Sequence, residues 1–163
     1  MSLGKEIERK WIVDKEKLPY DLSKCEPLVM EQSYICFSPT VRLRNTNDKS
    51  FVLCIKSRPQ PGSLARDEFE LELSRQQYEN LLTKKEGNTI RKTRYCVEEN
   101  GHTIEIDIFS GDLDGLAYAE IEFASEEEAM SYPNPEWVVK DVTFDHRYKN
   151  ASLAKNGLPE DAI

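Results

Sequence analysis

The stretch KEIERKWIV, residues 5–13, decides how the rest of the chain is interpreted. Alternate side chains of a β-strand share one face, which here places Glu6, Glu8 and Lys10 together. Neighbours on one face lie about 6.6 Å apart, so the two carboxylates can share a divalent cation and the ammonium can hold an anion that the cation also touches. The same pattern fits a solvated strand with mixed charges, and the remaining sequence has to separate the two interpretations.

The composition predicts one foldable domain over residues 1–163, because 39% of the residues are hydrophobic and 32% are charged. No export signal precedes the charged stretch, and the apolar runs are too short to cross a membrane. The four cysteines form no CxxC pair, which predicts reduced thiols and a cytoplasmic location. A net charge of −8 argues against a nucleic-acid partner but does not exclude an anionic small molecule.

Seven further segments show the strand pattern of alternating or β-rich residues. They cover residues 28–37, 40–45, 50–57, 65–73, 89–97, 103–109 and 116–123. Most are joined by hairpin-sized turns such as Asn100-Gly101, which predicts a mainly β, α+β fold built on an antiparallel sheet or barrel of about eight strands. A capping box at Ser74 and Gln77 predicts a helix that ends near Gly87. Short helices are also expected after Ser125 and between Asp145 and Gly157.

The polar faces of the strands segregate by sign. Acidic faces carry Glu6/Glu8, Glu68/Glu70/Glu72, Glu105/Asp107 and Glu120/Glu122. Basic faces carry Arg42/Arg44, Lys56 and Lys92/Arg94, whereas Arg91 lies on the other face of its strand. A closed sheet whose charged faces point inward explains this segregation, with its apolar outer face covered by the helices around residues 78–82 and 148–154.

A charged lumen implies a ligand with matching charges, because unpaired buried charges are costly. Arginine and lysine suit phosphate oxygens, and arginine can give them paired hydrogen bonds. Carboxylates suit Mg²⁺ or Mn²⁺, which are hard cations that prefer oxygen ligands. The two sets of residues together indicate a metal-bound polyphosphate.

A series of motifs, in order along nearly the whole chain, resembles the CYTH superfamily, also called the triphosphate tunnel metalloenzymes. They are EIERK at residues 6–10, TVRLR at 40–44, IK at 55–56, RDEFELE at 66–72, IRKTRY at 90–95, and the pair EIDIF at 105–109 and AEIEF at 119–123. The tail at residues 137–153 is also similar to that of the family. It departs at Val139 and Asp141, where members commonly carry glycine and glutamate, and this puts the local geometry of the tail in question.

The resemblance implies a closed eight-stranded antiparallel tunnel that binds triphosphates together with Mg²⁺ or Mn²⁺. By position it implies the metal ligands Glu6, Glu8, Asp107, Glu120 and Glu122. It implies the phosphate ligands Lys10, Arg42, Arg44, Lys56, Lys92 and Arg94, and it assigns catalysis to Glu6, Glu8 and Lys10. The carboxylates of Glu68, Glu70 and Glu72 would orient the basic residues or assist a metal, or would only balance the charge of the arginines.

These residues predict a metal-dependent hydrolase that cleaves a terminal phosphoanhydride, with inorganic triphosphate as the first choice of substrate. Fold alone does not choose among the activities of the family, so a nucleoside or thiamine triphosphatase and a class IV-type adenylate cyclase remain alternatives. A non-catalytic polyphosphate-binding module is a further alternative, although pure anion binding does not need paired carboxylates on several strands. A homodimer is left open.

Overall fold

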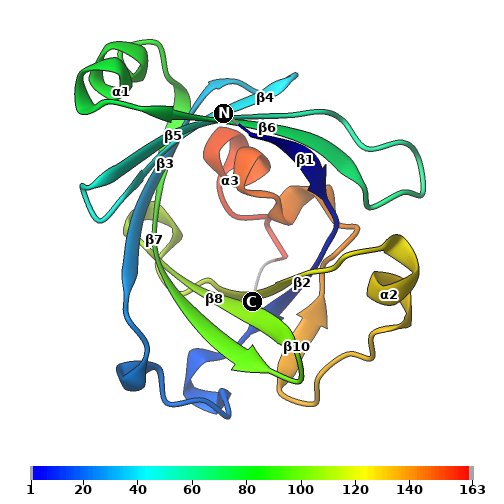
Figure 1. Cartoon of the computed structure of the whole chain (residues 1–163). Helices are drawn as coiled ribbons and strands as arrows, with labels where there is room; N and C mark the ends of the chain where they lie inside the picture. The colour runs from blue at the N-terminus through cyan, green and yellow to red at the C-terminus, as the bar shows by residue number, and fades with distance from the viewer. Residues whose placement is uncertain (1, 162–163) are drawn as a thin grey trace.

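The computed structural model describes residues 2–161, and its main element is one antiparallel sheet that curves into a ring (Figure 1). The ten strands are β1 (Ser2–Glu6), β2 (Glu8–Val13), β3 (Leu28–Cys36), β4 (Thr40–Thr46), β5 (Ser50–Lys56), β6 (Arg66–Leu73), β7 (Glu86–Glu99), β8 (His102–Ser110), β9 (Ala117–Glu122) and β10 (Val138–Asp141). They are hydrogen-bonded in the order β1-β6-β5-β4-β3-β7-β8-β9-β2-β10. The helices are α1 (Arg75–Leu82), α2 (Glu126–Ser131) and α3 (Asn150–Asn156), with 3₁₀ turns η1 (Lys15–Lys17), η2 (Leu22–Lys24), η3 (Gly111–Leu113) and η4 (His146–Tyr148).

The opening stretch joins the two sides of the ring. Strand β1 pairs with β6 and strand β2 pairs with β9, and only Ile7 separates β1 from β2. The carbonyl of Ile7 accepts a hydrogen bond from the amide of Phe123 at 2.7 Å. The predicted mainly β, α+β fold built on an antiparallel sheet is confirmed. The hydrogen-bonded order of strands has two ends, and the covalent chain at Ile7 completes the ring between them.

The eight strands predicted from the sequence are all present. Within residues 2–161 the structure has ten, because the predicted opening strand is divided into two and one further strand follows α2. The opening stretch forms the bent pair β1 and β2, and the seven other predicted segments form β3 to β9. Strand β10 was not predicted, because its four residues show no alternation and it pairs only with β2. Strand β7 begins at Glu86, so Gly87 belongs to a strand and does not end the helix before it.

Helix α1 covers the outer face of the ring as expected. Its predicted capping box is confirmed: the Ser74 hydroxyl accepts a hydrogen bond from the Gln77 amide, and the Gln77 side chain accepts one from the Ser74 amide. Tyr78 of the helix packs against the buried side chains of Leu43 and Phe51. This packing buries the apolar side of β4 and β5, so their polar side faces inward.

The C-terminal helix is not where the sequence placed it. Helix α3 was expected on the outer face, but it lies within the ring of strands in Figure 1 and packs against side chains of the inner face. Tyr34, Ile90, Phe109 and Tyr118 form a buried cluster with α3 and η4, so the helix closes one end of the ring. The sequence could not show this, because an apolar helical stripe looks the same on either side of a sheet.

The close approach of α3 depends on a glycine in β7. The φ angle of Gly87 is +69°, and a Cβ atom there would lie 2.7 Å from the carbonyl oxygen of Ala154. Residues other than glycine rarely adopt this conformation, and a side chain would force the helix away from the strand.

A second apolar cluster covers the outer side of β2, β8 and β9. Trp11, Ile106, Ile121 and Phe123 are buried there with Ala129 of α2. Arg9 ties the segment after α2 to this face, because its guanidinium donates to the carbonyls of residues 129 and 132 and to the side chains of residues 134 and 141. Asp141, which departs from the family pattern, thus has a structural partner.

Two further observations bear on the sequence-based expectations. No helix within residues 2–161 is long and apolar enough to cross a membrane. The cysteines Cys25, Cys36, Cys54 and Cys96 are free thiols.

Candidate phosphate and metal site

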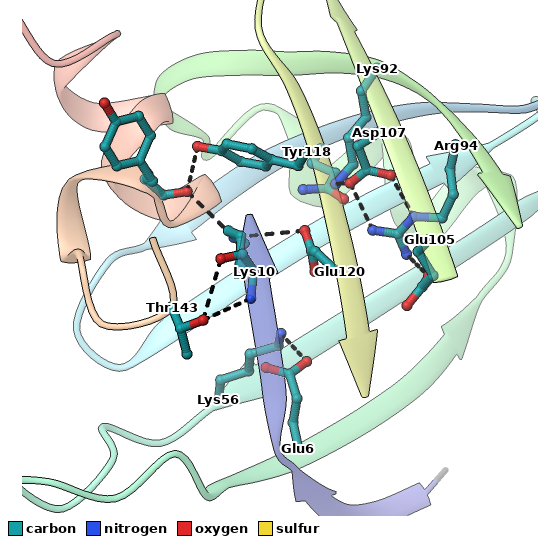
Figure 2. Close-up of polar contacts among 12 residues, drawn as sticks. Glu6, Lys10, Lys56, Lys92, Arg94, Glu105, Asp107, Tyr118, Glu120 and Thr143 are labelled. Atoms are coloured by element: carbon teal, nitrogen blue, oxygen red, sulfur yellow. Dashed lines mark hydrogen bonds and ion pairs between the residues drawn. The ribbon is translucent and has the colours of Figure 1, made fainter. Parts of the chain in front are cut away.

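Strand register brings the charged side chains together on the inner face of the ring. Glu8 lies opposite Glu122, and Lys10 lies opposite Glu120, on the pair β2 and β9. Arg94 of β7 lies opposite Asp107 of β8. Residues opposite each other in a ladder point to the same side, so each pair shares the interior. Figure 2 shows the pairs Lys10–Glu120 and Arg94–Asp107.

The wall formed by β7 and β8 is balanced in charge. The ammonium of Lys92 lies 2.6 Å from one Asp107 oxygen, and Nε of Arg94 donates to the other oxygen at 2.7 Å. Arg94 also pairs with Glu105. Asp107 is fully buried, and burial would raise its pKa, but Lys92 and Arg94 lower it below its ordinary value. Both oxygens of Asp107 are therefore used by cations of the protein.

A different arrangement surrounds Glu6 on the opening stretch. Its carboxylate accepts a hydrogen bond from the Lys56 ammonium at 2.6 Å. Burial would raise the pKa of Glu6, but the charges of Lys56, Arg42 and Arg66 lower it to about 2. Glu6 is thus a carboxylate anion at neutral pH.

Glu8, two residues further on, has the opposite electrostatic environment. Burial and the carboxylates of Glu120 and Glu6 raise its pKa to about 8. For Glu120 itself, burial would raise the pKa, but Lys10 and Arg94 lower it below the ordinary value. The ammonium of Lys10 lies 3.7 Å from Glu120, whose Oε1 is buried and accepts no hydrogen bond (Figure 2).

Glu122 completes this group at the more exposed side of the interior. It lies directly opposite Glu8 in the ladder and is exposed, unlike Glu120. Burial and the carboxylates of Glu6 and Glu105 raise its pKa. Glu8 and Glu122 therefore lie in the field of other carboxylates, whereas Asp107 of β8 is neutralised by Lys92 and Arg94.

The two arginines of β4 point into the same interior. Nε of Arg44 donates to the side-chain oxygen of Gln32 at 2.9 Å, and burial together with Arg42 and Arg94 lowers the pKa of Arg44 to about 10. Arg42 is only 7% exposed, and its Nε is buried without a hydrogen-bond partner. A buried guanidinium with an unused donor is suited to bind an anion.

Two carboxylates of β6 lie close to the thiol of Cys54 on β5. Sulfur and oxygen atoms of Cys54, Glu68 and Glu70 lie within 4.8 Å of one another, and in the part of the chain that the structure describes they form the one group of three potential metal ligands so close together. Burial and a hydrogen bond to Glu70 raise the pKa of Glu68 to about 7. Glu72, the third predicted supporting residue, is exposed. The predicted ligands on β1, β2 and β9 are less tightly gathered than this group.

The C-terminal segment at the closed end of the ring contacts Lys10 of the opening stretch through several hydrogen bonds. The carbonyl of Tyr148 accepts hydrogen bonds from the Tyr118 hydroxyl at 2.8 Å and from the Lys10 ammonium at 3.4 Å. The hydroxyl of Thr143 accepts a hydrogen bond from the Lys10 amide at 3.0 Å. Figure 2 shows both contacts, which fix Lys10 against the C-terminal segment.

Beside these contacts is a small cavity, which we call the mouth pocket. Its lining includes Glu6, Glu8, Lys10, Arg66, Thr143 and Lys149. Its free volume of about 40 Å³ holds a few water molecules, at roughly 10–15 Å³ each. Of the predicted phosphate ligands only Lys10 reaches this pocket, and the others lie among the side chains that fill the ring. Arg66 and Lys149 were not predicted as site residues. Alternation places Arg66 on the strand face of Glu68 and Glu70, a signal that could have included it, whereas Lys149 lies outside the strands.

The acidic group fits a hard divalent cation in its chemistry. Glu8, Glu120 and Glu122 supply only oxygen donors, the Glu120 Oε1 is buried without a hydrogen bond, and a bound cation would relieve the repulsion that raises the pKa of Glu8. Asp107 fits less well, because a metal there would compete with Lys92 and Arg94.

Fold and site together define a class of protein: an antiparallel tunnel with basic and acidic walls, suited to a polyanion and a cation. The match to a family model is in accord with this description. Residues 4–152 match the CYTH domain, and the chain belongs to the CYTH family.

Two relatives named as inorganic triphosphatases cover almost the same length. The inorganic triphosphatase of Nitrosomonas europaea is 35% identical over 154 residues, which are 91% of this chain and 96% of the relative. The inorganic triphosphatase of Acetivibrio thermocellus is 35% identical over 157 residues, 94% of this chain and 96% of the relative. The crystal structure of the inorganic triphosphatase NE1496 is similar with a TM-score of 0.65 and 33% identity, and the match covers 91% of this chain and 97% of that one.

Proposed function

We propose that this protein hydrolyses inorganic triphosphate in a reaction that depends on Mg²⁺ or Mn²⁺. The observation that carries the proposal is the pairing of a crowded acidic group, formed by Glu8, Glu120 and Glu122, with the buried, partner-free Nε of Arg42 on one inner face. The likeness to two inorganic triphosphatases over more than nine-tenths of the chain supports this choice of substrate.

Basic residues would bind the phosphate chain, and carboxylates would bind the cation. Arg42, Arg44 and Lys56 would hold phosphate oxygens, and Lys10 would stabilise charge on the phosphoryl group that is transferred. Lys92 and Arg94 would also attract phosphate oxygens, although Asp107 neutralises part of their positive charge. Glu6, Glu8, Glu120 and Glu122 would hold the cation. A bound cation supplies charge neutralisation and activation of water at this position.

Entry of the substrate would rearrange the interior. The mouth pocket is smaller than a triphosphate, so phosphate oxygens have to replace protein carboxylates as partners of the cations. The ion pair between Lys56 and Glu6 is the first candidate, because breaking it frees both a phosphate ligand and a metal ligand. This exchange couples substrate binding to metal binding.

Other substrates are the competing hypotheses. ATP and thiamine triphosphate carry the same phosphate chain, so the same walls would hold them, and a polyphosphate-binding module would hold the chain without cleaving it. The proposal also includes a cytoplasmic protein whose partner is a small molecule, with no nucleic acid or membrane partner.

The test is a phosphate-release assay with tripolyphosphate, ATP and thiamine triphosphate. We expect tripolyphosphate to be the best substrate, with activity in Mg²⁺ or Mn²⁺ and none in EDTA. Turnover that persists in EDTA contradicts the metal assignment, and a preference for ATP or thiamine triphosphate contradicts the substrate. Binding of tripolyphosphate without cleavage under any metal supports the module instead.

A further inference from the structure

A lysine outside the predicted constellation lines the mouth pocket. Lys149 is partly buried at the junction of η4 and α3, where it is the residue that precedes the first turn of the helix. Its neighbour Tyr148 is fully buried, and the Tyr148 carbonyl is held by Lys10 and Tyr118. The contacts that close the ring therefore also place Lys149 beside the opening strand.

Burial and two nearby cations lower the pKa of Lys149, whereas two carboxylates of the opening stretch raise it. The cations are Arg66 and Lys10, and the carboxylates are those of Glu8 and Glu6. Of these two carboxylates, Glu6 is already engaged by the ammonium of Lys56. Within residues 2–161, Lys149 forms no ion pair.

Its cationic neighbours leave this side of the pocket rich in donors. The Arg66 guanidinium donates to the carbonyl of Ser57 at 2.8 Å and approaches the Thr40 hydroxyl at 3.4 Å, so its partners are neutral. Three cations thus line one pocket, and of these only Lys10 pairs with a carboxylate. Such a cluster of cations is stabilised by an anion with several oxygens.

We propose that Lys149 is an additional phosphate ligand, which together with Arg66 binds the end of the triphosphate that reaches the mouth pocket. The inference rests on the proposed function and adds a contact from the C-terminal segment to those of the strands. In this position Lys149 would touch a terminal phosphoryl group in the pocket that Glu6 and Glu8 also line.

The experiment compares the wild type with Lys149→Met, Lys149→Arg and a matched control, Lys155→Met. Lys155 lies on the same helix and is exposed, and it does not line the pocket. Calorimetry with tripolyphosphate in EDTA should show affinity weakened by roughly tenfold in Lys149→Met, the loss expected for one charge-assisted contact. Lys149→Arg should keep most of the affinity, and Lys155→Met should match the wild type.

The KM for tripolyphosphate in Mg²⁺ should rise in Lys149→Met by a similar factor, and thermal unfolding should show that the variant is folded. Wild-type affinity and KM in Lys149→Met overturn the inference while leaving the proposed function intact. If Lys149→Met fails to fold, Lys149→Gln replaces it under the same criteria. A wild type that neither binds nor cleaves tripolyphosphate overturns the proposed function itself.

Discussion

The wall formed by β7 and β8 and the wall formed by β2 and β9 both carry basic and acidic residues, but their electrostatics differ. On the first, Asp107 is bound by Lys92 and Arg94 through both of its oxygens. On the second, Glu8 has carboxylates as its main neighbours, and its pKa rises to about 8. An acidic pair on a strand therefore serves as a counter-ion in one place and as a candidate metal site in the other.

The difference shows which carboxylates are available. A paired carboxylate in the interior stabilises the fold, because its removal leaves buried cations without a partner. A crowded carboxylate is a cost to the folded state until a cation or a proton neutralises it. Substitutions on the two walls should accordingly act on different properties, stability on the first and turnover on the second.

The largest effect is expected from Asp107→Asn, which removes the charge shared by Lys92 and Arg94. Breaking a buried pair of this kind costs about 3–5 kcal/mol, so the urea midpoint should fall sharply. Asp112→Asn, on the exposed turn η3, is the control and should keep the wild-type midpoint. An unchanged midpoint together with a lost response to Mg²⁺ would show that Asp107 is a metal ligand and not a counter-ion.

Next in size is the effect of Glu8→Gln on turnover. The substitution keeps the shape of the side chain but removes a carboxyl group that can give up its proton and bind the cation, so phosphate release in Mg²⁺ should fall by at least about a hundredfold. Glu127→Gln, at an exposed position of α2, should leave the rate unchanged. Because the crowding is relieved, Glu8→Gln should unfold no more easily than the wild type in EDTA. Full activity in Glu8→Gln would show that Glu8 is not a ligand of the catalytic metal.

Arg42→Ala tests whether Arg42 binds phosphate oxygens. Loss of a hydrogen-bonding cation should weaken tripolyphosphate binding by roughly tenfold to a hundredfold, measured by calorimetry in EDTA. Arg42→Lys should recover part of the affinity, because lysine keeps the charge but lacks the paired donors. Arg91→Ala removes an exposed arginine from β7 and serves as the control. Equal affinity in Arg42→Ala and the wild type would contradict the assignment of Arg42 as a phosphate ligand.

The smallest effect concerns pH. With a pKa of about 8 against an ordinary value of 4.5, Glu8 keeps a proton in the folded protein that it loses when the chain unfolds at intermediate pH. Its contribution to stability is therefore present below about pH 4.5 and is lost as the pH rises toward about 8. Glu6 has the opposite pH dependence, because its pKa is lowered to about 2. Its contribution to stability is present above about pH 4.5 and is lost as the pH falls toward about 2.

Urea unfolding in EDTA between about pH 6 and about pH 7 should show the difference. Over that interval the wild type should lose about 1 kcal/mol relative to Glu8→Gln, because at most one proton separates the two proteins. Saturating Mg²⁺ should remove most of this difference in slope if it binds the ionised form of Glu8. Parallel pH profiles for the two proteins would show that Glu8 is not crowded as described.

The sequence determined most of the architecture. Alternation placed Glu8, Lys10, Arg42 and Arg94 on polar strand faces, and the capping box at Ser74 correctly predicted the start of α1. The two residues of the hairpin turn, Asn100 and Gly101, adopt the positive φ angles that their types favour. These features depend on neighbours in the chain, so local patterns are sufficient to predict them.

The tertiary structure decided the roles of the charged residues. The sequence grouped Asp107 with Glu8, but strand register gave Asp107 two cations and gave Glu8 a carboxylate as its neighbour. The position of α3 inside the ring, and with it Lys149, also depends on contacts between distant segments. The pKa and the partners of a side chain are set by groups that approach through space, and a strand pattern carries no information about which strand will lie beside it.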